Sequence, residues 1–365
     1  MRYVPPDFTL PVFQQAPNAR WQPAPADGVL PEGFFSTSNL PTYVKIDGVW
    51  KLPRDPRMDA ALVLDPDRVP RAVEGRRVRA GQPVAVGYAE DGSEGIYVHA
   101  VGFQPEEPAA AAHEFKFMSS EVSREKPVDY DAMARLLVET RHRGGLILWV
   151  VGPAVVHARG REVLEWFVER GYVGALFGGN AVAVHDVEAA MFGTTLGMDD
   201  RGVPVPGGHA HHMRAINRVR CAGSLHAAVA QGWLTRGLFH ALVRRNVPFV
   251  LAGSIRDDGP LPDTITDAVA AQDAMRAYTR RTEMALFLAT ALHAIATGNM
   301  LPAYVYDEAS GDVRPLPTIC VDSTEFVVNK LKDRGTHQAF GVITNVQDFL
   351  PLLQVAVERA ERRIS

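Results

Sequence analysis

Hydrophobic and polar positions follow two different patterns along the 365-residue chain. In the first part the apolar runs are short and partly alternating, and turn-forming segments such as "EDGSEG" separate them. This pattern is typical of strands joined by turns. The strands are predicted at residues 42–52, 60–65, 82–89 and 95–103. We therefore expect a small β-rich domain here.

From Asp129 onward, helical patterns alternate with continuous apolar runs. Helices are predicted at residues 129–144, 161–171 and 348–363, and buried strands at 146–151, 173–179, 247–254 and 317–322. Strands that alternate with helices favour a parallel sheet covered on both faces. The predicted fold class is α/β, with a smaller β-rich domain in front.

The segment between Thr264 and Thr297 has apolar residues at helical spacing. It predicts one long amphipathic helical segment that stops before Gly298 and Pro302.

Three domains are predicted. Residues 1–32 carry many prolines and predict an extended arm over the surface or a partner subunit. Residues 33–112 form the β-rich domain, with a role in substrate binding or oligomerisation, and residues 113–365 form the catalytic domain. The segment "QPEEPAAAAHE", residues 104–114, is the predicted linker.

Composition excludes several classes of protein. With 47% hydrophobic and 22% charged residues the chain is an ordinary globular one. A formal net charge of -4 gives no reason to expect nucleic acid or an anionic membrane as partner. Two cysteines, Cys221 and Cys320, suit a reduced compartment. Without a signal-peptide pattern or a membrane-length apolar run, we expect a cytoplasmic protein.

Small residues follow three of the predicted strands, where a parallel sheet holds its ligands. Glycine there lets a phosphate or a nicotinamide ring approach the backbone, and a following helix offers free N–H groups. One such loop is ordinary in any α/β protein, whereas three in one sheet favour a nucleotide. Neither G-x-G-x-x-G nor G-x-x-x-x-G-K-[ST] is present. The predicted cofactor-binding residues are Gly152, Pro153, Ala154, Gly178, Gly179, Asn180, Ala181, Gly253, Ser254 and Ile255.

Asp322 ends the strand at residues 317–322. A carboxylate there either accepts hydrogen bonds from ribose hydroxyls or caps the next helix. If it meets a ribose, it favours NAD over NADP, because it would repel a 2′-phosphate.

Other polar residues are candidates for substrate contact. Asn39, Thr42, Arg57 and Asp59 border apolar strands, and Arg57 could clamp a carboxylate, although a solvated arginine is the commoner outcome. In "SIRDDGPLPD" two carboxylates stand beside Arg256, either as chemistry or as a salt-bridged turn.

The segment "GGHAHH" brings His209, His211 and His212 together, and His185 lies in "VHD". No H-E-x-x-H or Cys-x-x-Cys accompanies them, so no metal site is predicted. A pH-sensitive or cofactor-contacting loop is the favoured interpretation.

Long motifs give the chain a family resemblance. "VVGPAVVHARG", "LFGGNAVAVHD", "GHAHHMRAIN", "LAGSIRDDGPLPD", "GNMLPA" and "CVDSTEFVVNKLKDRG", in this order, resemble the archaeal-type ornithine cyclodeaminases. The same module forms the C-terminal part of the cyanobacterial arginine dihydrolase/ornithine cyclodeaminases and carries the LOR/SDH domain name.

The resemblance implies an NAD-binding fold similar to that of deoxyhypusine synthase and the sirtuins. It puts "GPAVV" under the pyrophosphate and nicotinamide ribose, and "GGNA" at the nicotinamide end. "AGSI" would hold the adenosine half. Asp322 and Thr344, Asn345 and Val346 would surround the adenine and its ribose.

The reaction implied is the conversion of ornithine to proline and ammonia, with NAD accepting a hydride from Cα and returning it to the cyclic imine. Protons must be moved in this cycle. Asp258 is the predicted proton shuttle, while Asp257 anchors the distal amine or pairs with Arg256. The resemblance also implies a homo-oligomer, a dimer or tetramer.

The sequence departs from the family at Leu40, where a histidine is expected. The substrate therefore stays open between ornithine and another diamino acid such as lysine. Two other functions are alternatives: an NADH-dependent imine reductase or opine-type dehydrogenase, and an NAD-sensing protein without turnover.

Overall fold

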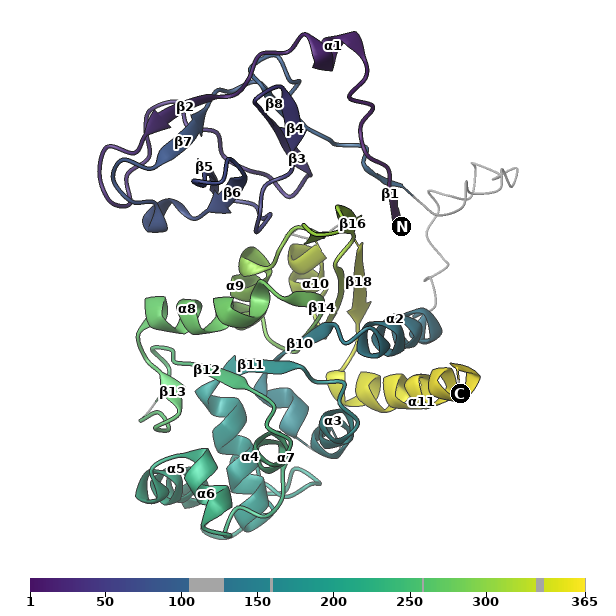
Figure 1. Cartoon of the computed structure of the whole chain (residues 1–365). Helices are drawn as coiled ribbons and strands as arrows, with labels where there is room; N and C mark the ends of the chain where they lie inside the picture. The colour runs from purple at the N-terminus through teal and green to yellow at the C-terminus, as the bar shows by residue number, and fades with distance from the viewer. Residues whose placement is uncertain (105–127, 158–159, 258, 333–337, 365) are drawn as a thin grey trace. The chain divides into compact units, whose positions relative to one another are not determined.

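The computed structural model describes residues 1–104, 128–157, 160–257, 259–332 and 338–364 (Figure 1). Within these ranges the chain forms two compact units. The first comprises residues 1–104 and Leu301–Leu316, and the second comprises residues 128–300, 317–332 and 339–364. The predicted linker lies outside the described residues except for Gln104, so its position stays a prediction.

The first unit is built from short antiparallel strands, as the apolar runs predict. Its sheets have the strand orders β2-β7-β5-β6, β4-β3-β8, β1-β9 and β15-β16. The elements are β1 (Arg2–Tyr3), α1 (Pro11–Gln14), β2 (Arg20–Pro23), β3 (Thr42–Ile46), β4 (Val49–Lys51), β5 (Ala61–Leu64), β6 (Pro70–Val73), η1 (Gly75–Arg77), β7 (Pro83–Val86), β8 (Ile96–Val98), β9 (Phe103–Gln104), β15 (Val305–Asp307) and β16 (Asp312–Arg314). Strand β2, inside the predicted arm, pairs with β7, so the structure draws no boundary at residue 32.

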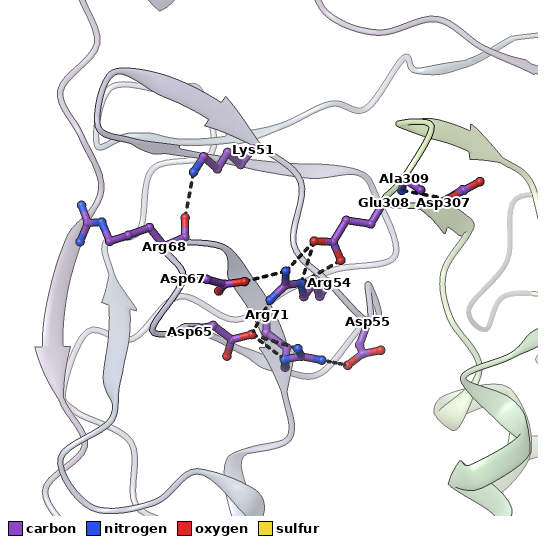
Figure 2. A network of polar contacts seen from close by, with 10 residues as sticks. All are labelled: Lys51, Arg54, Asp55, Asp65, Asp67, Arg68, Arg71, Asp307, Glu308 and Ala309. Carbon is purple, nitrogen blue, oxygen red and sulfur yellow. Dashed lines mark hydrogen bonds and ion pairs between the residues drawn. The ribbon is translucent and has the colours of Figure 1, made fainter.

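A network of charges joins the hairpin β15–β16 to the rest of this unit (Figure 2). The guanidinium of Arg54 lies 2.6 Å from the Glu308 carboxylate, 2.7 Å from Asp67 and 3.2 Å from Asp65. The hydrogen bonds that Arg54 donates to these carboxylates raise its pKa, those to Glu308 most. Glu308 thus holds a segment from late in the sequence against the N-terminal strands.

The second unit is the predicted α/β domain. Its elements are α2 (Tyr130–His142), β10 (Leu146–Val151), η3 (Pro153–Val156), α3 (Gly160–Glu169), β11 (Ala175–Gly179), α4 (Asn180–Phe192), η4 (Gly208–Ala210), α5 (His211–Ala222), α6 (Leu225–Ala230), α7 (Leu238–Arg244), β12 (Phe249–Ala252), β13 (Thr264–Ile265), α8 (Ala268–Thr279), β14 (Thr282–Leu288), α9 (Leu292–Met300), β17 (Pro317–Asp322), α10 (Glu325–Lys332), β18 (Gln338–Ile343) and α11 (Val346–Ile364).

The seven strands of this unit lie in the order β13-β12-β11-β10-β14-β17-β18. The chain starts in the middle at β10, builds outward through β11 and β12, and then returns to β14 on the other side of β10. Without β13 this is the 3-2-1-4-5-6 order of the Rossmann fold. The predicted α/β class is confirmed, and the sheet reverses its direction of growth between β10 and β14.

Helices cover both faces of the sheet, as Figure 1 shows. Helices α8, α9 and α10 pack on one face, and α2, α3, α4, α7 and α11 on the other. The main core lies on the second face and contains the fully buried Trp149, Phe167 and Phe349. Burial on both faces explains why β10 and β14 read as continuous apolar runs. Among the described residues no helix has the length and apolar character needed to cross a membrane.

The prediction for residues 264–297 was wrong. Instead of one helical segment, this stretch forms β13, α8, the strand β14 and the start of α9. Strand β14 pairs with β10 and β17 and is therefore central. A short apolar run buried on both faces carries no periodicity that separates a strand from a buried helix. The outer helix α8 is capped by Asp267, whose carboxylate accepts a hydrogen bond from Ala270 N at 2.7 Å.

Leu286 tests how much stability depends on β14, because it is fully buried in the middle of that strand. We expect Leu286→Ala to lower the free energy of unfolding by about 2–5 kcal/mol, through lost burial and a residual cavity. Val269→Ala, at an exposed position of α8, is the control and should change it by less than about 0.5 kcal/mol. Urea denaturation measures both, and equal effects would contradict a central β14.

Candidate functional site

A cavity of about 880 Å³ lies at the carboxyl ends of the strands on both sides of the switch between β10 and β14. This is where ligands bind in open α/β sheets. It is lined by residues that follow β10, β11, β12 and β14, together with side chains from helices. They include Gly152, Pro153, Ala154, His157, Gly179, Asn180, Ala181, His185, Leu196, His212, Ser254, Arg256, Asp257, Ala289, Thr290, His293 and Gln347.

Gly152 sets how closely the loops after β10 and β14 approach each other. Its N–H donates to Leu288 O at 2.8 Å, and a Cβ at this position would lie 1.9 Å from Ala289 O. No residue with a side chain fits there. Ala289 itself has a positive φ of 51°, so the β14 loop also contains a strained residue beside the cavity.

Helix α4 points its N-terminus at the cavity. Its N-cap, Gly179, provides no side-chain hydrogen bond, and Gly179, Asn180 and Ala181 all line the cavity. The first N–H groups of a helix lack intrahelical partners and favour an anion. The arrangement therefore suits a phosphate group.

Asn180 serves the fold with its side chain. Its Oδ1 accepts hydrogen bonds from Leu261 N at 2.9 Å and from Thr264 Oγ1 at 3.0 Å. These bonds connect the start of α4 to the segment after the β12 loop. Asn180 thus positions the wall of the cavity.

The loop after β12 contributes the charged residues Arg256 and Asp257. One carboxylate oxygen of Asp257 accepts a hydrogen bond from Ser254 N at 2.8 Å, which closes the loop on itself. Arg256 N donates to Ser254 Oγ at 3.2 Å. Asp258 lies outside the described residues, so its predicted role as the proton shuttle stays a prediction.

Three histidines form a row along one wall of the cavity. His157 Nε2 lies 3.1 Å from His185 Nδ1, and the rings of His185 and His212 are 5.7 Å apart, edge to face. Burial, and then the charges of the two neighbouring histidines, lower the pKa of His185 to about 4. Burial also lowers the pKa of His157, against the opposing effect of Glu188.

His293 and Gln347 line the cavity and were not predicted. His293 follows β14, and burial lowers its pKa while Ala252 and Asp257 raise it. The side-chain amide of Gln347 donates to Ala154 O and His157 O, both at 3.2 Å, and so holds the loop after β10. Because the segment of β14 carries a helical pattern, its sequence does not indicate a strand end before His293.

Several predicted cofactor residues do not line the cavity. Val346 is buried in the core, and Asn345 Oδ1 accepts from Gln347 N at 3.0 Å at the start of α11. Ile255 is fully exposed. One carboxylate oxygen of Asp322 accepts hydrogen bonds from the N–H and the hydroxyl of Thr324, in the turn before α10, which begins at Glu325. Neither the capping nor the ribose alternative follows from these bonds. Gly178, Gly253 and Thr344 also lie outside the lining, and Thr344 N donates to Asp322 O at 3.0 Å.

The two segments assigned to the adenosine half lie on opposite sides of the sheet's switch point. Ser254 follows β12 and Asp322 ends β17, and β11, β10 and β14 lie between these strands. At about 4.8 Å per strand the two segments are roughly 19 Å apart. One adenosine is shorter than this distance, so it cannot contact both segments at once as predicted.

 A single dinucleotide bound across the switch point would instead have its two halves on the two sides.

The predicted substrate residues belong to the first unit. Arg57 pairs with Glu74 at 2.6 Å and donates to Met58 O at 3.1 Å, and Thr42 is buried with its hydroxyl 3.1 Å from Leu40 O. Asn39 is half-buried and Asp59 is exposed. Leu40 packs against the core of this unit. A substrate role for these residues stays a prediction.

The described residues contain no group of three or more His, Cys, Asp or Glu side chains arranged to hold a metal ion. Cys320 is fully buried in β17, as expected for a core residue, and Cys221 is exposed.

Known proteins share both the sequence and the fold. A family model described as arginine dihydrolase ArgZ-like, C-terminal, Rossmann fold, matches residues 131–353, and one for the first region of that part matches residues 41–131. An ornithine cyclodeaminase of Methanopyrus kandleri is 46% identical over 96% of this chain and 80% of its own length.

Two solved structures extend the likeness. A conserved LOR/SDH protein from Methanococcus maripaludis has 42% identity and a TM-score of 0.81, over 94% of this chain and 99% of that one. AgrE, a bifunctional arginine dihydrolase/ornithine cyclodeaminase of Nostoc, was crystallised with ornithine and NAD+. That structure has 37% identity and a TM-score of 0.59, over 97% of this chain and 47% of that one.

Gly152 allows a direct test of the close approach between the two loops. We expect Gly152→Ala to destabilise the protein by about 1–3 kcal/mol or more, because the added methyl group meets backbone that has to shift. Gly298→Ala in α9 is the matched control, since its Cβ would meet nothing within 4 Å, and it should be neutral or stabilising. Thermal unfolding compares the two, and a neutral Gly152→Ala would contradict the geometry.

The lowered pKa of His185 predicts a pH dependence of stability. The unfolded chain binds a proton here near pH 6.5, whereas the folded protein does so only near pH 4. The stabilising contribution is complete above pH 6.5 and is lost as the pH falls to about 4. His185→Gln should flatten the free energy of unfolding over this range, and His142→Gln, at an exposed position, should not. Parallel curves for wild type and His185→Gln would refute the shift.

Proposed function

Because the chain belongs to the archaeal ornithine cyclodeaminase family, we propose that it is an NAD-dependent cyclodeaminase that converts ornithine to proline and ammonia. The observation that carries the proposal is the cavity at the switch between β10 and β14, which brings glycine loops, a free helix N-terminus and charged side chains together. The complex of the related AgrE with ornithine and NAD+ supports both ligands.

The cavity fits a dinucleotide. Its volume is within the usual range for cofactor sites. Gly152 and Gly179 lack a Cβ that would clash with Ala289 O and with the His293 ring, so they let the loops around the cavity lie close together. The first N–H groups of α4 would hold a phosphate. When bound, NAD supplies the acceptor and donor of the hydride.

Most of the ionisable side chains of the cavity come from the β11–β12 side, and His293 comes from the β14 side. Asp257 follows β12, and His185 and His212 come from α4 and α5. We therefore assign the reacting end of the cofactor to the β11–β12 side. The adenosine half then extends toward β17, where Asp322 has a second carboxylate oxygen with which to meet a ribose hydroxyl.

Arg256 and Asp257 match the two ends of an α-amino acid with a distal amine. Among the described lining residues Arg256 is the only arginine or lysine, and Asp257 is the only carboxylate. Arg256 would pair with the substrate carboxylate. Asp257 would hold the distal ammonium with its oxygen that does not accept from Ser254 N. Asp258, beside them in the sequence, is our candidate for removing the α-amine proton.

The first test is to incubate the protein with NAD and L-ornithine and to measure proline, ammonia and NADH together. We expect equal amounts of proline and ammonia with no net NADH, because the hydride taken from Cα returns to the product. Net oxidation of NADH with a keto acid and an amine would favour an imine reductase or opine-type dehydrogenase. Nucleotide binding without turnover of any diamino acid would favour a sensor.

Variants locate the chemistry within the same assay. Asp258→Asn should abolish proline formation. Arg256→Gln should raise the KM for ornithine about 10- to 100-fold, the equivalent of one lost charged hydrogen bond. Arg214→Gln, at an exposed position of α5, is the control and should leave the KM unchanged.

A further inference from the structure

The proposed reaction has to move protons inside the cavity. Ornithine enters with two ammonium groups, and each must lose a proton: the α-amine before its Cα–H bond breaks, and the δ-amine before it attacks Cα. The C–N bond to the ring then forms, and the α-nitrogen leaves as ammonia. One proton returns to the ring amine of proline and one to ammonia, so the protons balance.

Few described groups in the cavity can take up two protons. Arg256 contributes a guanidinium, which has only donors, and Asp257 contributes a single carboxylate. The other ionisable lining residues are the histidines His157, His185, His212 and His293. Imidazole exchanges protons near neutral pH and is the usual group for this task.

Three of these histidines are neighbours in space. His157 Nε2 and His185 Nδ1 are 3.1 Å apart, so one of the two nitrogens donates to the other. The ring centroid of His212 lies 5.7 Å from that of His185, edge to face. His293, from the opposite side of the switch, does not join this row within the described residues, and its Nδ1 lies 3.5 Å from Thr290 Oγ1.

A buried carboxylate stands behind the row. Glu188 is fully buried and lies 3.9 Å from His212 Nδ1, which is itself buried and has no hydrogen-bond partner among the described residues. The carboxylate accepts hydrogen bonds from Thr194 Oγ1, Leu196 N and Gly197 N. A negative charge held in this way favours a proton on the nearby imidazoles, against the cost of their burial.

The other end of the row reaches a second cavity. His157 lines both the main cavity and a hollow of about 270 Å³, and among the described residues it alone lines both. The charged residues around this hollow are Arg161, Glu162, Asp199 and Asp200. The row therefore connects the candidate reaction site with a second, more acidic space.

We propose that His157, His185 and His212, with Glu188 behind them, form a proton relay that takes up the protons released by the substrate amines and returns them to the products. This inference rests on the proposed function and deepens it. His185, whose pKa is lowered by burial, is the middle member, and His212 beside Glu188 is the end member. The uncharged resting state of His185 leaves one ring nitrogen free to accept.

Two substitutions of His185 separate proton transfer from positioning. His185→Asn keeps an amide near the place of Nδ1 and so can keep the hydrogen bond to His157, but it cannot pass a proton. His185→Gln removes both the hydrogen bond to His157 and the proton transfer. We expect the kcat for proline formation to fall about 100-fold or more in each variant, with added imidazole restoring part of it. The KM for ornithine and the affinity for NAD, measured by fluorescence titration, should stay within a few-fold of wild type.

Further variants make the outcome unambiguous. His157→Gln, in the loop after β10, should show the same loss of kcat and covers the case in which the His185 variants fail to fold. His142→Gln, an exposed histidine at the end of α2, should behave as wild type. Full activity in His185→Asn would overturn the relay in favour of positioning, as would losses that imidazole does not restore. A wild-type protein that forms no proline would instead overturn the proposed function.

Discussion

The site depends on the contact between the backbones that follow β10 and β14. These strands are neighbours in the sheet although more than a hundred residues separate them in the sequence. Their loops meet at Gly152 and Ala289, where Gly152 has no room for a Cβ. Since the chain leaves the two strands in opposite directions, the loops diverge beyond this contact. The cavity opens in the space between them.

Burial decides what the ionisable groups of this cavity can do. His185 lies in a helix that packs on the sheet, so solvent cannot stabilise its charged form. Glu188, one turn further along α4, has a carboxylate that accepts three hydrogen bonds. One helix thus presents a neutral base and a carboxylate to the same row of side chains. On an exposed helix the surroundings of the two side chains would differ less, because water screens their charges.

The sequence predicted much of this unit and failed where local pattern carries no information. Strands β10, β11, β12 and β17 were found because apolar runs ended in glycine or aspartate. Strand β14 ends at Leu288, and the sequence from there, "LATALHA", contains no glycine. Its apolar run was therefore predicted as part of the neighbouring helices. That error also hid His293. The histidine row could not be predicted, since His157, His185 and His212 come from three elements that only the tertiary fold brings together.

The chain lacks G-x-G-x-x-G but still has the two physical features that this motif combines. In that motif, glycines allow a tight turn and close backbone approach, and a helix N-terminus receives the phosphate. Here Gly152 lets the backbone of the β14 loop approach the end of β10 closely, while the helix N-terminus follows the next strand, at Gly179 and Asn180. The two functions are divided between neighbouring loops of one sheet edge. A motif search requires them in one loop, but strand order requires only that both loops reach the switch point.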